Sequence, residues 1–300
     1  MIITVEMVRE LRERTGAGMM ECKKALEIAQ GNIENAITGL RKLGQAKVAK
    51  KADRLAANGV ITTKISDDGR AAIILEVNCE TDFVSRDSSF LTFVDVVVTG
   101  GLRARANNLS ELSQIVLDDG RTILEAKDSL IATIGENINI RRIALLEFRQ
   151  NGGQEGAIYG YIHGNGKIGV LVALSLANAE LGKDMAMHIA ALNPMAILPE
   201  ELAEDLVTKE KEIAWAALRD SSKPREIQEK IVSGKMEKFI NASVLVGQGF
   251  VKDPEVKVRD LLAKYGAQVS SFIRFEMGEG IERKEVDFAA EVQKQIDNKK

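Results

Sequence analysis

The chain has 300 residues, with 41 lysines and arginines, 44 aspartates and glutamates and a net charge of −3. This length predicts two or three domains, and the balanced charge argues against nucleic-acid binding driven by overall charge. The only cysteines are Cys22 and Cys79, which excludes a disulfide framework and fits a reducing compartment. A charged N-terminal segment without a cleavable apolar stretch, and no 18-residue apolar run, predict a cytoplasmic protein that does not enter a membrane.

The residue chemistry argues against an enzyme. His163 and His188 are the only histidines, and neither has the spacing of a zinc ligand. The sequence contains neither a GxSxG nucleophile elbow nor a GxxxxGKS/T phosphate loop. We therefore expect no catalytic residue, no metal site and no cofactor. An enzyme that uses only carboxylates has no such signature and stays an alternative.

The first 45 residues predict a small module of three helices. Apolar residues at helical spacing mark helices over residues 4–14, 19–29 and 32–44, with glycine-containing turns between them. Met19 and Met20 are adjacent, and neighbouring helical residues point about 100° apart. Both cannot be fully buried in so small a module, so we expect an exposed pair, typical of an adaptable apolar contact surface.

The next stretch, residues 42–58, is rich in lysine and alanine. This composition fits a solvated helical linker, and it also fits a basic strip that faces an acidic partner. We place the end of the N-terminal module, residues 1–54, within this stretch.

An internal repeat organises the middle of the chain. Residues 59–76 align without gaps with residues 156–173. Each copy predicts two strands joined by a glycine-containing turn, followed by a helix. We expect two α+β subdomains with antiparallel sheets, one at 55–140 and one at 141–198 with 237–275. The identical pairs in the alignment are Gly59 and Gly156, Ile61 and Ile158, Ile65 and Ile162, and Gly69 and Gly166.

The turn of the second copy contains a misleading motif. Residues 164–169 match the GxGxxG pattern of dinucleotide-binding proteins. In dinucleotide-binding proteins the motif joins a strand to a helix. Here predicted strands flank the motif on both sides, so we expect a hairpin turn. His163 begins the turn, and we expect its side chain to be exposed. Such a histidine is either an inert surface residue or a functional one.

The second copy is interrupted at residues 199–236. Apolar residues at helical spacing on both sides of a turn at 220–224 predict an antiparallel helical hairpin. Large apolar residues are scarce, so we expect the hairpin to project from the body. Its apolar seam serves either the hairpin itself or contact with a partner. The C-terminal module, residues 276–300, is predicted to contain an amphipathic helix over 285–297.

Residues 81–84, Thr-Asp-Phe-Val, follow the second predicted strand of the first copy. Asp82 fits the N-cap of the coming helix, with Phe83 as its apolar staple. The alternative is an exposed acid–aromatic tip, a shape suited to insertion into another protein. The local pattern on its own favours the cap.

Five segments together resemble the bacterial translation elongation factor Ts family. They read TGAGMMECKKAL, EVNCETDFVSRD, GENINIRR, HGNGKIGVLVA and FIRFEMGEGIERKEVDFAAEV, in order over nearly the whole chain. Two departures from the family pattern are Ser85-Arg86-Asp87, where the family often has Ala-Lys-Asn or Ala-Lys-Asp, and a slightly longer turn at 66–70. Neither departure changes Asp82 or Phe83.

The resemblance implies a guanine-nucleotide exchange factor for elongation factor Tu, and not an enzyme with covalent chemistry. The implied fold has an N-terminal module resembling ubiquitin-associated domains, a duplicated α+β core, a protruding helical hairpin and a C-terminal helix. No direct nucleic-acid contact is implied, and a homodimer or a 2:2 complex with the partner is left open. The alternative is an adaptor that binds another protein without exchange activity, which would leave the core unexplained.

The resemblance also implies the contact residues. Phe83 would enter between two helices of the partner's GTPase domain, disturb its Mg²⁺ site and loosen its hold on GDP. The implied contacts in this segment are Thr81, Asp82, Phe83 and Val84, those of the N-terminal module are Val8, Leu11, Met19 and Met20, and that of the second core subdomain is His163.

Overall fold

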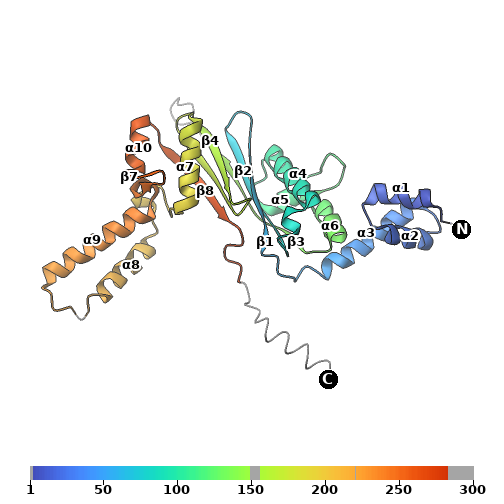
Figure 1. The fold of residues 1–300 in the computed structure, drawn as a ribbon, viewed down its shortest axis with the longest axis horizontal. Coiled ribbons are helices and arrows are strands. Elements are labelled where there is room, and N and C mark those ends of the chain that lie inside the picture. Colours follow the sequence, from blue (N-terminus) through green and yellow to red (C-terminus); the bar gives the residue numbers. More distant parts are fainter. Residues whose placement is uncertain (1–2, 149–155, 220, 283–300) are drawn as a thin grey trace, which may run out of the picture.

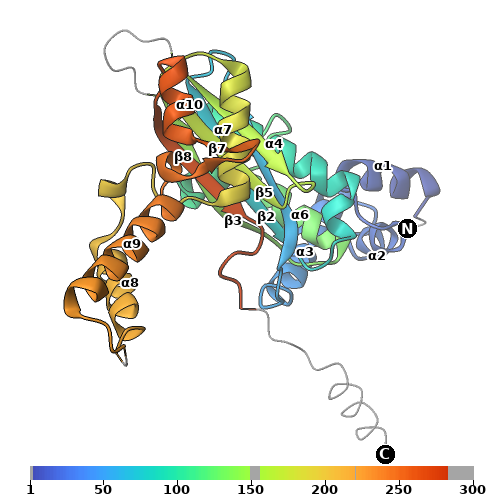
Figure 2. The ribbon, with the colours of Figure 1, turned by 60° about the vertical axis from the view of Figure 1, so that its left-hand side comes forward.

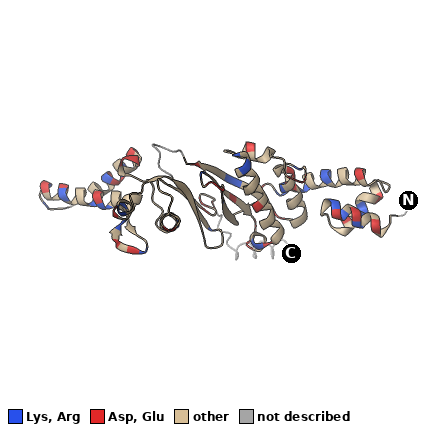
Figure 3. Cartoon of the chain, turned by 90° about the horizontal axis from the view of Figure 1, so that it is seen from above, with Lys and Arg blue, Asp and Glu red and all other residues tan. Residues whose placement is uncertain are grey.

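A computed structural model describes residues 3–148, 156–219 and 221–282 of the chain. The molecule is elongated and of the α+β class, with small antiparallel sheets (Figure 1). Three N-terminal helices form one end, two stacked sheets with their covering helices form the middle, and a pair of helices projects at the other end. Basic and acidic residues alternate along the helices of both ends, whereas the sheets carry fewer charges (Figure 3).

The N-terminal helices are α1 (Val5–Thr15), α2 (Met19–Ile28) and α3 (Ile33–Ala49). Gly16 ends α1 in the left-handed conformation, with φ of 67°, which glycine adopts without strain. Helix α3 is longer than predicted because its C-terminal part packs against the middle of the molecule through Val48. The lysine-rich stretch is therefore helical up to Ala49 and largely exposed, as predicted, but Val48 docks it on the middle of the molecule. The buried residues of this module are Leu11, Cys22, Ala25, Leu26 and Ala36.

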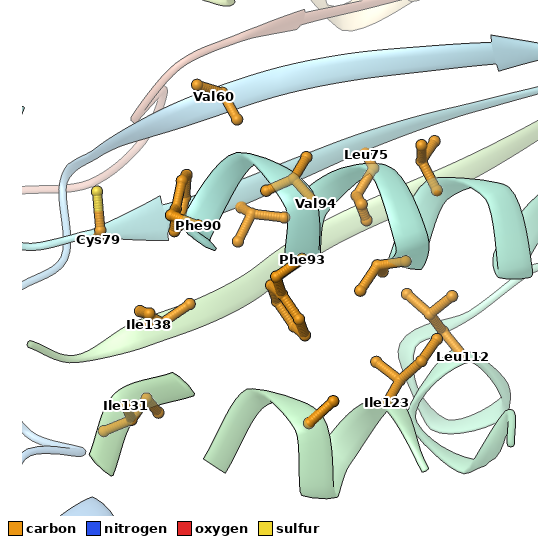
Figure 4. Close-up of a cluster of buried hydrophobic side chains, with 14 of the residues drawn as sticks. Val60, Leu75, Cys79, Phe90, Phe93, Val94, Leu112, Ile123, Ile131 and Ile138 are labelled. Atoms are coloured by element: carbon orange, nitrogen blue, oxygen red, sulfur yellow. The ribbon is translucent and has the colours of Figure 1, made fainter. Parts of the chain in front are cut away.

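The first sheet has the order β1-β2-β3, with all neighbours antiparallel. Every residue of the central strand is buried, because helices cover one face and the second sheet covers the other. Phe90 and Val94 lie between their helix and the strand that carries Leu75 (Figure 4). The elements are β1 (Asn58–Ile65), β2 (Ala71–Cys79), α4 (Ser88–Ala104), α5 (Leu109–Gln114), α6 (Ile123–Ile134) and β3 (Ile138–Glu147).

The second sheet repeats this plan in the order β4-β5-β8, again antiparallel. Helices α7 and α10 lie on its outer side (Figure 2). The GxGxxG segment forms the turn between β4 and β5, as predicted. The elements are β4 (Ala157–His163), β5 (Ile168–Leu174), α7 (Ala179–Leu192), β6 (Gly249–Phe250), β7 (Asp253–Lys257), α10 (Val258–Tyr265) and β8 (Val269–Glu276).

Reciprocal hydrogen bonds relate the two repeats. The N–H of Ile61 donates to the carbonyl of Gly166, and the N–H of Ile158 donates to that of Gly69, both at 2.8 Å. The two isoleucines are equivalent in the sequence repeat, and so are the two glycines. Each turn therefore contacts the first strand of the other copy, which gives the stacked sheets an approximate twofold relation. Apolar side chains of both copies, including Ile74 and Leu171, fill the interface.

The projecting helices are α8 (Glu204–Ala216) and α9 (Arg225–Ser243), which pack on each other antiparallel. Helix α9 continues beyond residue 236 until Ser243 reaches the body. Near the outer end, the guanidinium of Arg225 lies 4.4 Å from the ring centre of Trp215, which accounts for the placement of that tryptophan. The predicted terminal helix over 285–297 lies outside the described residues.

His188 of α7 is buried in the second repeat as a neutral imidazole. Its Nδ1 accepts the N–H of Val251 at 3.1 Å, so the proton is on Nε2, which donates to Gln248 at 3.0 Å. Burial lowers the pKa of His188 below its ordinary value of 6.5, with the bond to Gln248 acting in the opposite direction.

Acidification should therefore destabilise the fold. The unfolded chain binds a proton at His188 below about pH 6.5, whereas the folded chain does so only at lower pH, so the free energy of unfolding decreases over that interval. Urea unfolding at about pH 7.5 and about pH 5.5 measures the loss. The variant His188→Gln should show a smaller difference between the two pH values, and an unchanged difference would contradict this assignment.

Candidate protein-interaction site

An exposed aromatic tip lies between β2 and α4. Strand β2 ends at Cys79, and the chain then forms a short 3₁₀ turn, Val84–Arg86, before the helix begins. Phe83 stands immediately before this turn and is 82% exposed, the largest value for any large apolar residue in the described part of the chain. A phenylalanine that buries almost nothing in the free chain is available to a partner.

The backbone beneath Phe83 is firmly held. Val84 and Ser85 are buried, and the Ser85 hydroxyl donates to the carbonyl of Asp82 at 2.7 Å. The carboxylate of Asp82 faces solvent and pairs with Arg86 at 3.1 Å. The tip thus presents one acid and one aromatic side chain on a fixed base, whereas Val84 contributes to the core below.

The capping interpretation of Asp82 is wrong. Asp87 is the N-cap of α4, and its carboxylate accepts the N–H groups of Ser89 and Phe90. The hydrogen bond from the Ser89 hydroxyl lowers the pKa of Asp87 most, and the two backbone N–H groups lower it further. Phe90 supplies the buried aromatic contact that was expected from Phe83, so neither residue of the tip takes part in capping the helix.

The second repeat has no equivalent tip. In the first repeat, residues 80–87 connect the second strand to the helix, whereas residues 175–178 suffice in the second. There Asn178 caps α7 directly, with its side chain accepting the N–H of Leu181 at 3.0 Å. The fold therefore does not require the longer connection of the first repeat.

Cys79 lies at the base of the tip as a structural thiol. Burial raises its pKa to about 12, the carboxylate of Glu136 acts in the same direction, and the charge of Lys167 opposes them. The thiol donates to the carbonyl of Thr81 at 3.1 Å. A thiol with so high a pKa is a poor nucleophile, and Cys79 acts here as a hydrogen-bond donor beneath the tip.

The methionine pair is exposed at the start of α2, as expected from the helical geometry. Met19 is 58% exposed and Met20 65% exposed. Leu11, by contrast, is completely buried and belongs to the core of the module, so a direct contact with a partner is excluded in this arrangement. Val8 is half-buried against the same core. Of these four residues, the two methionines therefore supply most of the exposed apolar surface.

His163 is exposed at the end of β4, and its Nδ1 lies 3.1 Å from the hydroxyl of Tyr161. The turn that follows contacts Ile61 through Gly166. The carbonyl of Lys167 in this turn accepts the N–H of Met277 at 2.8 Å, and the side chain of Met277 contacts Asn78, the residue before Cys79. His163 and the tip therefore lie toward the same end of the stacked sheets, although they come from different repeats.

The described residues contain no group of three or more potential ligands that could hold a metal ion. None of the helices in this part of the chain is long and apolar enough to cross a membrane. A hollow of about 300 Å³ lies between α4 and the segment before α6, away from the tip, and is lined partly by Thr99, Arg103 and Val116.

Sequence reasoning missed the residues that hold the tip in place. Glu136 accepts two hydrogen bonds from Thr81, although 55 positions separate them. The segment GENINIRR carried the family resemblance, but no local pattern links its glutamate to the tip. Only the folded arrangement brings the end of β2 beside the turn between α6 and β3.

Comparison with known proteins gives a consistent result over the whole chain. Residues 80–279 match the family model described as elongation factor TS. The chain is 51% identical over 287 residues to elongation factor Ts of Alcanivorax borkumensis, covering 96% of this chain and 98% of the relative. It is 49% identical over 294 residues to that of Hahella chejuensis and 46% identical over 294 residues to that of Legionella pneumophila strain Paris, with 98% of each chain covered. The chain therefore belongs to the elongation factor Ts family of translation elongation factors.

Proposed function

We propose that this protein is a cytoplasmic guanine-nucleotide exchange factor that binds elongation factor Tu and promotes release of GDP. The observation that carries the proposal is Phe83, an exposed aromatic side chain on a buried and hydrogen-bonded base. Asp82 and Phe83 approach the nucleotide site, where the inserted ring disturbs the bound Mg²⁺ and the phosphate-binding loop. No covalent bond changes, so the chain needs no nucleophile, general base or metal of its own.

The mechanism is thermodynamic linkage. A protein that binds the nucleotide-free partner more tightly than the GDP-bound partner must weaken GDP binding by the same factor. Each tenfold loss of GDP affinity requires about 1.4 kcal/mol of differential binding, and burial of one phenylalanine supplies about 1.5–3 kcal/mol. One inserted ring therefore cannot provide a large effect, so contacts from other parts of the chain must contribute.

Two further contacts supply this binding energy in the proposal. Met19 and Met20 bind the same domain of the partner through an adaptable apolar surface. His163 reaches another part of the partner from the second repeat. Because these residues lie on three separate elements, they bind a large protein surface, and the energy of the outer contacts supports the insertion of Phe83.

The test follows GDP release directly. Elongation factor Tu loaded with fluorescent GDP is mixed with this protein and excess unlabelled nucleotide, and the decay of fluorescence is recorded. The proposal expects release to accelerate and to saturate with protein concentration. Binding to elongation factor Tu without faster release would favour the adaptor alternative, and absence of both would contradict either function.

The methionine pair gives a separate prediction. The double variant Met19→Ala, Met20→Ala should weaken binding to elongation factor Tu by about tenfold, because two apolar contacts are lost from the interface. Calorimetric titration measures the dissociation constant. Met195→Ala is a matched control, since Met195 is 64% exposed but lies between α7 and α8. Equal dissociation constants for the double variant and the control would show that the pair does not bind the partner.

A further inference from the structure

The base of the tip is held by a turn that is distant in the sequence. The N–H of Thr81 donates to one carboxylate oxygen of Glu136 at 3.0 Å, and its hydroxyl donates to the other at 2.7 Å. Because the hydroxyl proton is committed to Glu136, the hydroxyl oxygen is free to accept the N–H of Val84 at 3.4 Å. One carboxylate thereby fixes residues on both sides of Asp82 and Phe83.

The next residue of the turn connects the tip to the N-terminal module. The N–H of Asn137 donates to the carboxylate of Glu80 at 2.6 Å. Its side-chain amide donates to the carbonyls of Ala52 and Arg54, at 3.2 Å and 2.7 Å. Both carbonyls belong to the segment between α3 and β1, which leads out of the module. Arg54 also lies 3.6 Å from the carboxylate of Glu80.

We infer that Glu136 and Asn137 are positioning residues for nucleotide exchange, an inference that rests on the proposed function. Glu136 sets the direction in which Phe83 projects, and Asn137 fixes the separation between Phe83 and the methionine pair. Neither residue needs to touch the partner. When two contact surfaces are held at a fixed separation, binding of the first places the second beside its site on the partner. Less conformational entropy is then lost on binding.

An ordinary structural role is separable from this positioning role because α6, the helix that precedes Glu136, offers a matched control in its first turn. At the other end of α6, Glu125 accepts the N–H of Thr122 at 2.9 Å and its hydroxyl at 3.3 Å. This is the same pairing of a glutamate with a threonine, and no hydrogen bond joins it to the tip. Glu125→Gln therefore reproduces the chemical change of Glu136→Gln at a place that should not affect Phe83.

The experiment measures the maximal rate of fluorescent GDP release and the concentration for half-maximal effect, using the full chain. Glu136→Gln should lower the maximal rate by about tenfold, Glu136→Asp should give a smaller loss, and Glu125→Gln should leave the rate unchanged. Asn137→Ala should mainly raise the half-maximal concentration. In the Phe83→Ala background, Glu136→Gln should have little further effect, because Glu136 acts through Phe83.

Three results would overturn the inference. One is an equal loss from Glu136→Gln with and without Phe83, which would indicate a general structural role. Another is a loss from Glu125→Gln as large as that from Glu136→Gln. The third is an unchanged half-maximal concentration for Asn137→Ala. Failure of the unaltered protein to accelerate release would instead refute the proposed function, so the two outcomes are distinguishable.

Discussion

Replacing Phe83 with alanine should slow the exchange reaction by about tenfold to a hundredfold. Burial of a phenylalanine in a protein interface is worth about 1.5–3 kcal/mol, and about 1.4 kcal/mol corresponds to a factor of ten. The measurement is the maximal rate of fluorescent GDP release from elongation factor Tu. The double variant Asp82→Ala, Phe83→Ala should be at least as slow, since it removes the acidic group as well.

The folded chain itself should tolerate the Phe83 substitution. Because Phe83 is 82% exposed, loss of its ring should change the free energy of unfolding by no more than about 0.5 kcal/mol. Val116→Ala is a suitable control, since Val116 is 64% exposed on the same repeat and lies away from the tip. Exchange by Phe83→Ala at the rate of the Val116→Ala control would refute the insertion of Phe83.

The repeated architecture was predictable because it is encoded locally. Turn glycines and strand residues recur at a constant spacing. The repeated glycines have equivalent structural roles in both copies. Gly59 and Gly156 begin the equivalent hairpins, where a side chain would collide with the neighbouring strand's backbone. Gly69 and Gly166 turn with positive φ and accept the reciprocal hydrogen bonds. The turn conformations are local features, whereas the close approach of Gly59 to Val77 and the bond from Ile61 to Gly166 join distant segments.

The exposed position of the tip residues was harder to predict, because two aspartates both fit the N-cap position of α4. Asp82 and Asp87 both precede an apolar helical pattern, and an N-cap preference alone does not distinguish them. The choice depends on the 3₁₀ turn between them and on the contact of Thr81 with Glu136, which comes from another segment. Leu11 was misplaced for a similar reason, since the helical pattern shows an apolar face without showing how much of it α3 covers.

An ionic cluster centred on the buried Glu76, with Arg141, Arg142 and Glu279 around it, could not be predicted from local sequence patterns either. Glu76 of β2 is completely buried. It accepts from Arg141 at 3.1 Å, from Arg142 and from the N–H of Gly278 at 2.9 Å. Arg142 continues to Glu279 at 3.0 Å. The cluster joins the first sheet to the segment after β8, so its partners lie in different repeats and share no local pattern.

Replacing Glu76 with alanine should therefore lower the free energy of unfolding by about 3–5 kcal/mol. Removal of one member of a buried ion pair leaves its partners uncompensated, and here two arginines lose their shared acceptor. Urea unfolding followed by circular dichroism measures the change. Glu76→Gln keeps the volume and one acceptor oxygen, so its loss should be smaller.

An exposed pair provides the control for this prediction. Glu147 binds Arg105 at the end of β3, and both side chains are largely exposed. Glu147→Ala should cost only about 0–1 kcal/mol, because water already solvates both charges. The comparison isolates burial as the cause, since each substitution replaces a glutamate that pairs with arginine by alanine. A similar loss for Glu76→Ala and Glu147→Ala would contradict a stabilising role for the buried carboxylate of Glu76.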